Sequence, residues 1–219
     1  NKYQTPVIAL VANFQNVSEY FTHKEVSELI HEFGHIMHHI FGKAKYCLFS
    51  GTNIEYDLAE VFGLFFEKLS WNKHVLDQIG KHAITGKKLS SRKLKKMCKI
   101  RNMDISIKLR FQILSAFYDQ LVHCSNNFIE LSRTLLSIDN DKERTENVSR
   151  TMLNVFKQLY KQIMTVFDIN DKEYTIPIQN VFLPGVWIFL INGNDAMYYS
   201  SILSDIYATD MYVNHSNKN

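Results

Sequence analysis

The stretch Thr22-His-Lys-Glu25-Val-Ser-Glu-Leu-Ile-His31-Glu32-Phe-Gly-His35-Ile-Met-His-His-Ile40 decides the local fold of this sequence. Thr22 is followed three residues later by Glu25, a capping-box pattern that starts a helix, and Gly42 marks where that helix ends. The apolar residues recur at helical spacing, so one face of the helix is expected to be buried. His31 and His35 then lie one turn apart on a common face, where their imidazoles can converge on one point.

Two convergent imidazoles beside a carboxylate predict a zinc site. Catalytic zinc takes about three protein ligands and keeps one position for water. Glu60 is the candidate third ligand, because it lies in a second predicted helix, Asn53–Ser70, that opens with another capping pattern at Thr52 and Glu55. Glu32 points to one side of the histidine row, which suits a general base that accepts a proton from water.

The neighbouring residues leave alternatives open. Asp57, one turn before Glu60, is a candidate for orienting an imidazole, or else a carboxylate favoured by the helix dipole. His38 and His39 continue the first helix but project elsewhere, so we do not expect them to be ligands. The alternative for the histidine pair itself is a hydrogen-bonded pair at the edge of a core, without metal.

Composition narrows the class of protein. The chain has 219 residues, is 46% hydrophobic, and carries a formal charge of +3, so it is globular and gives no sign of nucleic acid or a membrane as its main partner. The eight basic residues of Lys87–Arg101 are interpreted as a solvated helix face rather than a nucleic-acid site. Three cysteines without paired spacing indicate reduced thiols and an intracellular protein. Because the chain opens with Asn1, we expect a piece of something longer.

Periodicity predicts a mainly α architecture with one small strand element, Val7–Phe14, near the N-terminus. We expect residues 1–219 to form a single catalytic region. The further predicted helices are Val75–Ala83, Ser91–Arg101, Ile105–Cys124, Asn126–Leu136, Lys142–Asp168 and Asp195–Val213.

Ordered motifs along almost the whole chain carry a family resemblance. They are Pro6–Phe14, His31-Glu-Phe-Gly-His35, Ser50-Gly-Thr52, Asp57-Leu-Ala-Glu60-Val61 with Glu67 seven positions later, His82-Ala-Ile-Thr-Gly86, Ala116-Phe-Tyr-Asp119 with His123, and Asp195-Ala-Met-Tyr-Tyr199 through Met211. With them the chain resembles the thimet oligopeptidase family, which includes neurolysin, oligopeptidase A and mitochondrial intermediate peptidase. The Asp-Leu-Ala-Glu-Val form looks closer to the last of these.

The resemblance implies a helical fold in which two lobes flank a channel that admits short peptides. His31, His35 and Glu60 would be the ligands of one Zn²⁺, and Glu32 the general base. Ser50, Gly51 and Thr52 would lie along the substrate backbone. This chain would be the zinc-bearing part, its opposite lobe lying elsewhere in the full-length protein. A mitochondrial matrix or other organelle setting is expected ahead of the cytosol.

The chain departs from the family near its C-terminal motif. The position of a family histidine falls on Phe189 (or Leu190), and two family tyrosines become Asn194 and Ser201. Tyr198 and Tyr199 remain, so Tyr198 is the expected donor to the reacting carbonyl and Tyr199 a substrate contact, although Tyr198 could instead be a core aromatic. Phe62-Gly63-Leu64 also replaces the usual Pro-Ser-Gln.

Two functions follow from these observations. The first is a zinc metalloendopeptidase that hydrolyses short or presequence-derived peptides through a metal-activated water. The alternative is a metal-binding pseudo-peptidase that binds peptides without turning them over.

Overall fold

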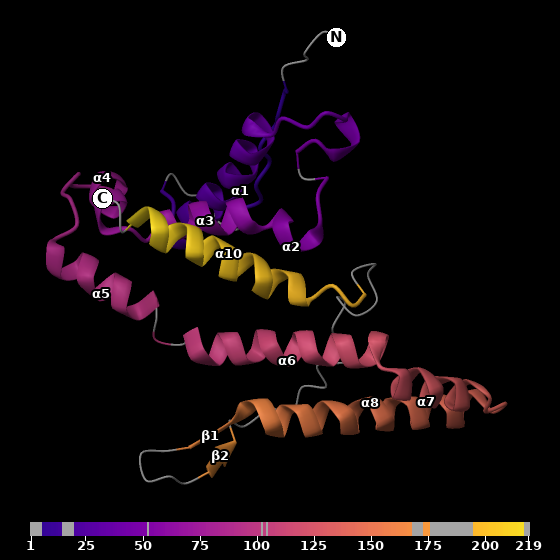
Figure 1. The fold of residues 1–219 in the computed structure, drawn as a ribbon. Coiled ribbons are helices and arrows are strands. Elements are labelled where there is room, and N and C mark those ends of the chain that lie inside the picture. Colours follow the sequence, from indigo (N-terminus) through magenta and orange to yellow (C-terminus); the bar gives the residue numbers. More distant parts are fainter. Residues whose placement is uncertain are drawn as a thin grey trace. The chain divides into compact units, whose positions relative to one another are not determined.

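The computed structural model describes residues 6–14, 20–51, 53–101, 103, 105–167, 173–175 and 195–216. The chain divides into two compact units, one formed by Asn1–Met103 with Leu203–Asn219 and the other by Asp104–Ile202. Helix α10 (Tyr199–Ser216) begins in the second unit and continues in the first. Figure 1 colours both units along the sequence.

The first unit is built from short helices around one long helix. Its elements are α1 (His23–Phe41), the 3-10 turn Cys47–Phe49, α2 (Tyr56–Ala59), α3 (Val61–Leu69), α4 (Lys73–Ile79), α5 (Ser91–Arg101) and most of α10. The predicted capping box is present, because the Thr22 side chain accepts from the backbone N–H of Glu25 while the Glu25 carboxylate accepts from the backbone N–H of Thr22. Two orphan donors at the start of α1 are thereby satisfied.

Helices α1 and α3 pack closely because both carry glycine where they meet. A Cβ added to Gly34 would lie 2.5 Å from the carbonyl oxygen of Phe62 and 2.9 Å from the Cα of Gly63. Beside this contact the buried hydroxyls of Ser27 and Ser70 are 2.6 Å apart, and Ser70 donates onward to the carbonyl of Glu67. The result is a fixed register between the two helices.

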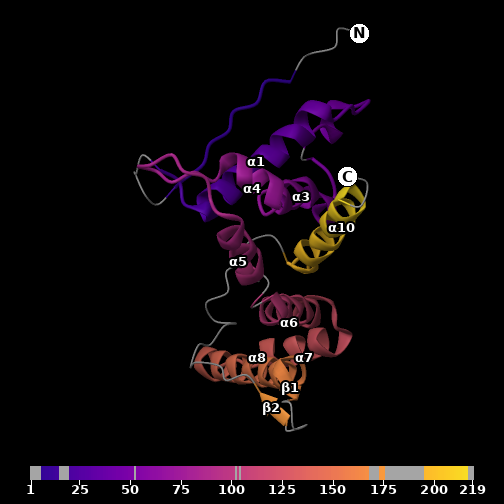
Figure 2. The ribbon, with the colours of Figure 1, turned by 90° about the vertical axis from the view of Figure 1, so that its left-hand side faces the viewer.

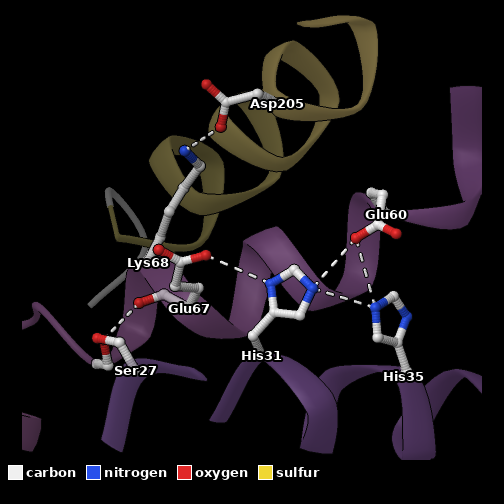
Figure 3. Close-up of polar contacts among 8 residues, drawn as sticks. Ser27, His31, His35, Glu60, Glu67, Lys68 and Asp205 are labelled. Atoms are coloured by element: carbon white, nitrogen blue, oxygen red, sulfur yellow. Dashed lines mark hydrogen bonds and ion pairs between the residues drawn. The ribbon is translucent and has the colours of Figure 1, made fainter. Parts of the chain in front are cut away.

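Helix α10 makes polar contacts with α2 and α3. The buried Ser204 hydroxyl donates to the backbone carbonyl of Asp57 at 2.6 Å. Lys68 of α3 pairs with Asp205 at 2.6 Å, with the Lys68 side chain largely buried. Figure 3 shows this pair above the α1–α3 contact. The three helices α1, α3 and α10 therefore form the frame in which the candidate site lies.

The second unit is a helical stack with a small hairpin. It contains α6 (Ile105–Cys124), α7 (Asn126–Leu136), α8 (Asp141–Met164), β1 (Thr165–Phe167) and β2 (Glu173–Thr175). Helices α6 and α8 lie next to each other in both ribbon views, and Figure 1 shows that they run antiparallel (Figures 1 and 2). Their interface is the core, made of Leu114, Tyr118, Phe156, Tyr160 and Met164. The strands pair antiparallel, with Val166 opposite Tyr174.

The mainly α class is confirmed, and α1, α5, α6 and α7 lie where the sequence placed them. The prediction of a strand element near the N-terminus is wrong. Residues 6–14 form no strand in the described chain, and Val7 is 97% exposed. An apolar run forms a strand only where a partner accepts its backbone hydrogen bonds, and within the described residues the paired strands are β1 and β2.

Four elements also differ from expectation in their boundaries. The predicted helix Asn53–Ser70 is interrupted at Glu60, which forms a turn between α2 and α3. Helix α4 begins two residues early, because the Asn72 side chain caps it by accepting from the N–H of His74. Helix α8 ends at Met164, where β1 begins, and α10 begins at Tyr199 rather than Asp195.

Among the described helices, none combines the length and apolar character needed to cross a membrane.

Candidate metal centre

Helix α1 presents its two motif histidines toward one point, as the one-turn spacing predicts. The Nε2 atoms of His31 and His35 are 3.1 Å apart, and the rings meet edge to face with centroids 4.9 Å apart. Each side chain is about four-fifths buried, at 19% and 20% exposed. Figure 3 shows both imidazoles directed at the same place.

Glu60 completes the cluster from the turn between α2 and α3. Its Oε2 lies 3.1 Å from Nε2 of His31 and 3.5 Å from Nε2 of His35. Among the described residues, these three form the one group of histidine, cysteine or acidic side chains able to hold a metal ion together. The break in the predicted helix therefore falls on the third candidate ligand.

The three atoms fit a tetrahedral zinc ion. Ligand atoms about 2.0–2.1 Å from zinc in a tetrahedron lie about 3.3 Å from one another. The observed separations of 3.1, 3.1 and 3.5 Å fall on either side of that value. The Nδ1 of His31 also faces a carboxylate, which places the ring proton on Nδ1 and directs the lone pair of Nε2 toward the cluster.

The electrostatics of the cluster favour a cation. Hydrogen bonds to Glu60 and then Glu67 raise the pKa of His31 to about 9, against the lowering effect of burial. Hydrogen bonds from His31 and His35 in turn hold the pKa of Glu60 well below its usual range. Without metal, a proton on His31 supplies positive charge between the two carboxylates at neutral pH.

Glu67, rather than Asp57, contacts an imidazole of the cluster. The Nδ1 of His31 bonds to Oε2 of Glu67 at 3.3 Å, whereas Asp57 reaches neither imidazole and contributes its backbone carbonyl to Ser204. Within the described residues it is Glu67 that reaches His31, whereas Asp57 lies in the first turn of α2, as the helix-dipole alternative expected. The signal for Glu67 was available, because residues seven apart lie on one face of a helix and Glu67 follows Glu60 by seven.

Gly63 lets the histidines approach α3. A Cβ at this position would lie 2.6 Å from Nε2 of His31 and 2.9 Å from Nε2 of His35. In the sequence, Gly63 stands where the resembling family has a serine. With these imidazole positions, a side chain at Gly63 would require the two rings to shift.

Glu32 lies beside the cluster but is not part of it. Its side chain is exposed and, within the described residues, makes no hydrogen bond or ion pair. It lines two hollows that flank the cluster, of about 660 and 470 Å³. A carboxylate open to both sides can accept a proton from water or from a bound molecule.

The remaining predicted residues are distributed as follows. His38 stacks on Phe62, with ring centroids 4.6 Å apart, and His39 packs against Gly51, so neither joins the cluster. Ser50 and Gly51 lie near the end of α1, Gly51 with φ of +69°. Their predicted substrate contacts stay predictions, and Thr52 lies outside the described residues.

The C-terminal candidates belong to the other unit. Tyr198 donates its backbone N–H to the buried carboxylate of Asp119 at 3.0 Å, and Tyr199 starts α10. Their roles at a reacting carbonyl stay predictions. Ser201 lies in α10, whereas Phe189 and Asn194 lie outside the described residues.

Fold and site together define a helical protein with a candidate His–His–Glu metal centre. The chain matches peptidase family M3 over residues 1–219 and belongs to that family. It is 30% identical over 216 residues to the thimet-like oligopeptidase of Dictyostelium discoideum, covering 95% of this chain and 28% of that protein. It is 34% identical over 125 residues to the mitochondrial intermediate peptidase of Arabidopsis thaliana, covering 55% and 18%. It is 26% identical over 214 residues to oligopeptidase A of Haemophilus influenzae, covering 95% and 28%.

The family resemblance drawn from the sequence motifs is thus confirmed. The chain spans less than a third of the length of these relatives.

Proposed function

We propose that this chain is the zinc-binding catalytic part of a metalloendopeptidase that hydrolyses short peptides. The observation that carries the proposal is the convergence of two Nε2 atoms and one carboxylate oxygen within 3.5 Å, with the exposed carboxylate of Glu32 beside them. Membership of a peptidase family supports the same reading.

In this proposal His31, His35 and Glu60 hold the ion, and Glu67 keeps the His31 ring oriented. A zinc ion bound there supplies a Lewis acid that polarises a carbonyl and makes a nearby water more acidic. Glu32 accepts the proton from the attacking water and returns it to the leaving amine. The hydrogen bond from His31 to Glu67 fixes the ring tautomer, so the site is preorganised before substrate arrives.

The test is Glu32→Gln in the longest natural chain that contains these residues. Zinc content should stay at one ion per chain, because Glu32 is not a ligand, while turnover of a quenched short peptide falls by about 10²–10⁴-fold. Glu146→Gln on α8 is the matched control, because this exposed glutamate lines neither hollow beside the cluster, and it should keep full turnover. Undiminished cleavage by Glu32→Gln excludes the mechanism.

A peptide-binding protein without turnover is the second candidate. It is favoured by Phe189, Asn194 and Ser201, which stand where the resembling family has groups that donate to the substrate. A donor to a developing oxyanion contributes on the order of 10²–10³ in rate. Zinc-dependent turnover that disappears with Glu32→Gln removes this candidate, and peptide binding with zinc but no turnover establishes it.

The cellular setting follows the relatives' names. Mitochondrial intermediate peptidases among them favour a mitochondrial matrix location and presequence-derived peptides as substrates. We further propose that the opposite lobe of the full-length protein closes over the site and limits substrates to short chains. Imaging of the tagged full-length protein against a matrix marker tests the location, and resistance of a folded protein substrate tests the size limit.

A further inference from the structure

Residues 195–198 form a strained turn directly before α10. Ala196 has φ of +61°, and among the described residues it is the one residue other than glycine with positive φ. Residues that carry a Cβ rarely adopt this left-handed backbone, so such a turn persists only where its neighbours hold it. Tyr198 is the last residue of the turn. We call residues 195–198 the tyrosine turn.

Two neighbouring side chains of α6 hold the tyrosine turn. The carboxylate of Asp119 accepts the backbone N–H of Ala196 at 3.1 Å through Oδ1 and the backbone N–H of Tyr198 at 3.0 Å through Oδ2. Gln120 donates its side-chain amide to the carbonyl of Ala196 at 2.6 Å. Both backbone polar groups of the strained residue are therefore bonded to α6, within the second unit.

Asp119 is itself firmly placed. It is 1% exposed and follows Tyr118, a core residue between α6 and α8. His123, one turn later on α6, donates from Nδ1 to Oδ1 of Asp119 at 3.0 Å. A carboxylate taken out of water needs such donors, because an unpaired buried charge is costly. Within the described residues, the donors to this carboxylate are one imidazole and the two N–H groups of the tyrosine turn.

We propose that Asp119 is a positioning residue, which holds the tyrosine turn so that the hydroxyl of Tyr198 is directed at the bound peptide. The inference rests on the proposed peptidase function and on the role predicted for Tyr198 at the reacting carbonyl. Bonds at Ala196 and Tyr198 fix the backbone on both sides of Met197, and the side chain of Tyr198 leaves that backbone in one direction. A donor to a reacting carbonyl is most effective when it is oriented before the substrate binds.

Hydrogen exchange followed by mass spectrometry tests the hold on the turn in the zinc-loaded full-length protein. Asp119→Asn keeps the shape of the side chain but leaves one acceptor oxygen for two backbone N–H groups. Exchange over residues 195–198 should accelerate by about tenfold, while the core residues of α8 keep their wild-type rates. Asp139→Asn, which changes an exposed carboxylate of the same unit, is the matched control and should alter neither. Unchanged exchange in Asp119→Asn overturns the inference.

Turnover of a quenched short peptide tests the consequence for Tyr198. Asp119→Asn and Tyr198→Phe should each lower kcat by about tenfold or more, with KM within about twofold of the wild type. The double variant should be within about twofold of the slower single variant, because a hydroxyl that has lost its orientation contributes little. Losses that multiply in the double variant indicate a structural role separate from Tyr198 and overturn the inference.

Ala196→Val disturbs the tyrosine turn without changing the buried carboxylate. A β-branched side chain is strongly disfavoured at positive φ, so this variant should reproduce the loss in kcat and its coupling to Tyr198→Phe. Ala83→Val is the matched control, because Ala83 is exposed and its φ is not positive, and it should keep the wild-type kcat. Wild-type kcat in Ala196→Val overturns the inference even if Asp119→Asn fails to fold.

Failure of this inference can be distinguished from failure of the proposed function. Turnover by the wild type that Tyr198→Phe leaves unchanged overturns the inference and leaves the peptidase intact. If the wild type binds the peptide with zinc but cleaves nothing, the peptidase is excluded, and calorimetric Kd values replace kcat in the same double-mutant comparison. Coupled losses of binding in Asp119→Asn and Tyr198→Phe then support the positioning role, and independent losses overturn it.

Discussion

Replacing Glu67 by Gln should weaken zinc binding although Glu67 is not a ligand. The change keeps the shape of the side chain and an acceptor oxygen, but it removes the negative charge that His31 Nδ1 faces at 3.3 Å. Loss of such an orienting carboxylate costs 10–100-fold in metal affinity. The contact is long and the Glu67 side chain is 39% exposed, so we expect a loss of zinc affinity at the lower end of that range, about tenfold or ~1.4 kcal/mol.

The assay is competition for zinc against a chromophoric chelator, with the wild type and Asp57→Asn measured beside Glu67→Gln. Asp57→Asn is the matched control, because its side chain bonds neither imidazole, and it should bind zinc within about twofold of the wild type. Far-UV circular dichroism should be unchanged in both variants. Equal affinity of Glu67→Gln and the wild type, or an equal loss in Asp57→Asn, refutes the reasoning.

The size of the Glu67→Gln effect should depend on pH. Glu60 and Glu67 raise the pKa of His31 to about 9 in the metal-free protein, so a proton competes with zinc at neutral pH. The substitution weakens the binding of that proton as well as the binding of the zinc ion. The deficit should therefore widen as pH rises from 7 toward 9, where the competition fades in the wild type. A deficit that narrows with pH contradicts this account.

Three further predictions concern the frame and the charge of the site. Gly34→Ala should lower the free energy of unfolding by about 1–3 kcal/mol in urea titrations and should reduce zinc affinity, because its Cβ would lie 2.5 Å from the Phe62 carbonyl oxygen and push α3 away. Unchanged zinc affinity would show that the distance between α1 and α3 does not determine the geometry of the cluster. Thr22→Ala should cost about 1 kcal/mol by removing the helix cap, with Thr22→Ser as the control that restores it. The pKa of His31 is raised, so its protonation stabilises the metal-free protein fully below about pH 6.5, and that contribution is lost as pH rises through about 9. Zinc affinity should rise over the same pH range. If the stability of the metal-free protein instead increases over this range, the charge assigned to His31 is wrong.

Local signals were sufficient for most of the helices. The bounds of α5, α6 and α7 follow from apolar periodicity, and the start of α1 follows from its capping box, because both depend on residues within one or two turns. The strand expected at residues 6–14 failed for the opposite reason. A strand depends on a partner that may lie anywhere in the chain, and composition alone does not name one.

The candidate site likewise has features that local sequence determines and features that depend on tertiary packing. The sequence by itself determined that His31 and His35 share a helix face with Glu32 beside them, since 3.6 residues per turn leaves no other arrangement. It also named Glu60 as third ligand, by its place in the following helical segment and by family resemblance. The distance from Glu60 to the imidazoles was decided only by the tertiary structure.

Helices α1 and α3 approach closely because Gly34 and Gly63 remove the side chains that would separate them, and the Ser27–Ser70 contact fixes their register. That crossing brings Glu67, and not Asp57, to His31. Helical periodicity is a local property of the chain, whereas the choice between two carboxylates ten residues apart depends on how two helices pack.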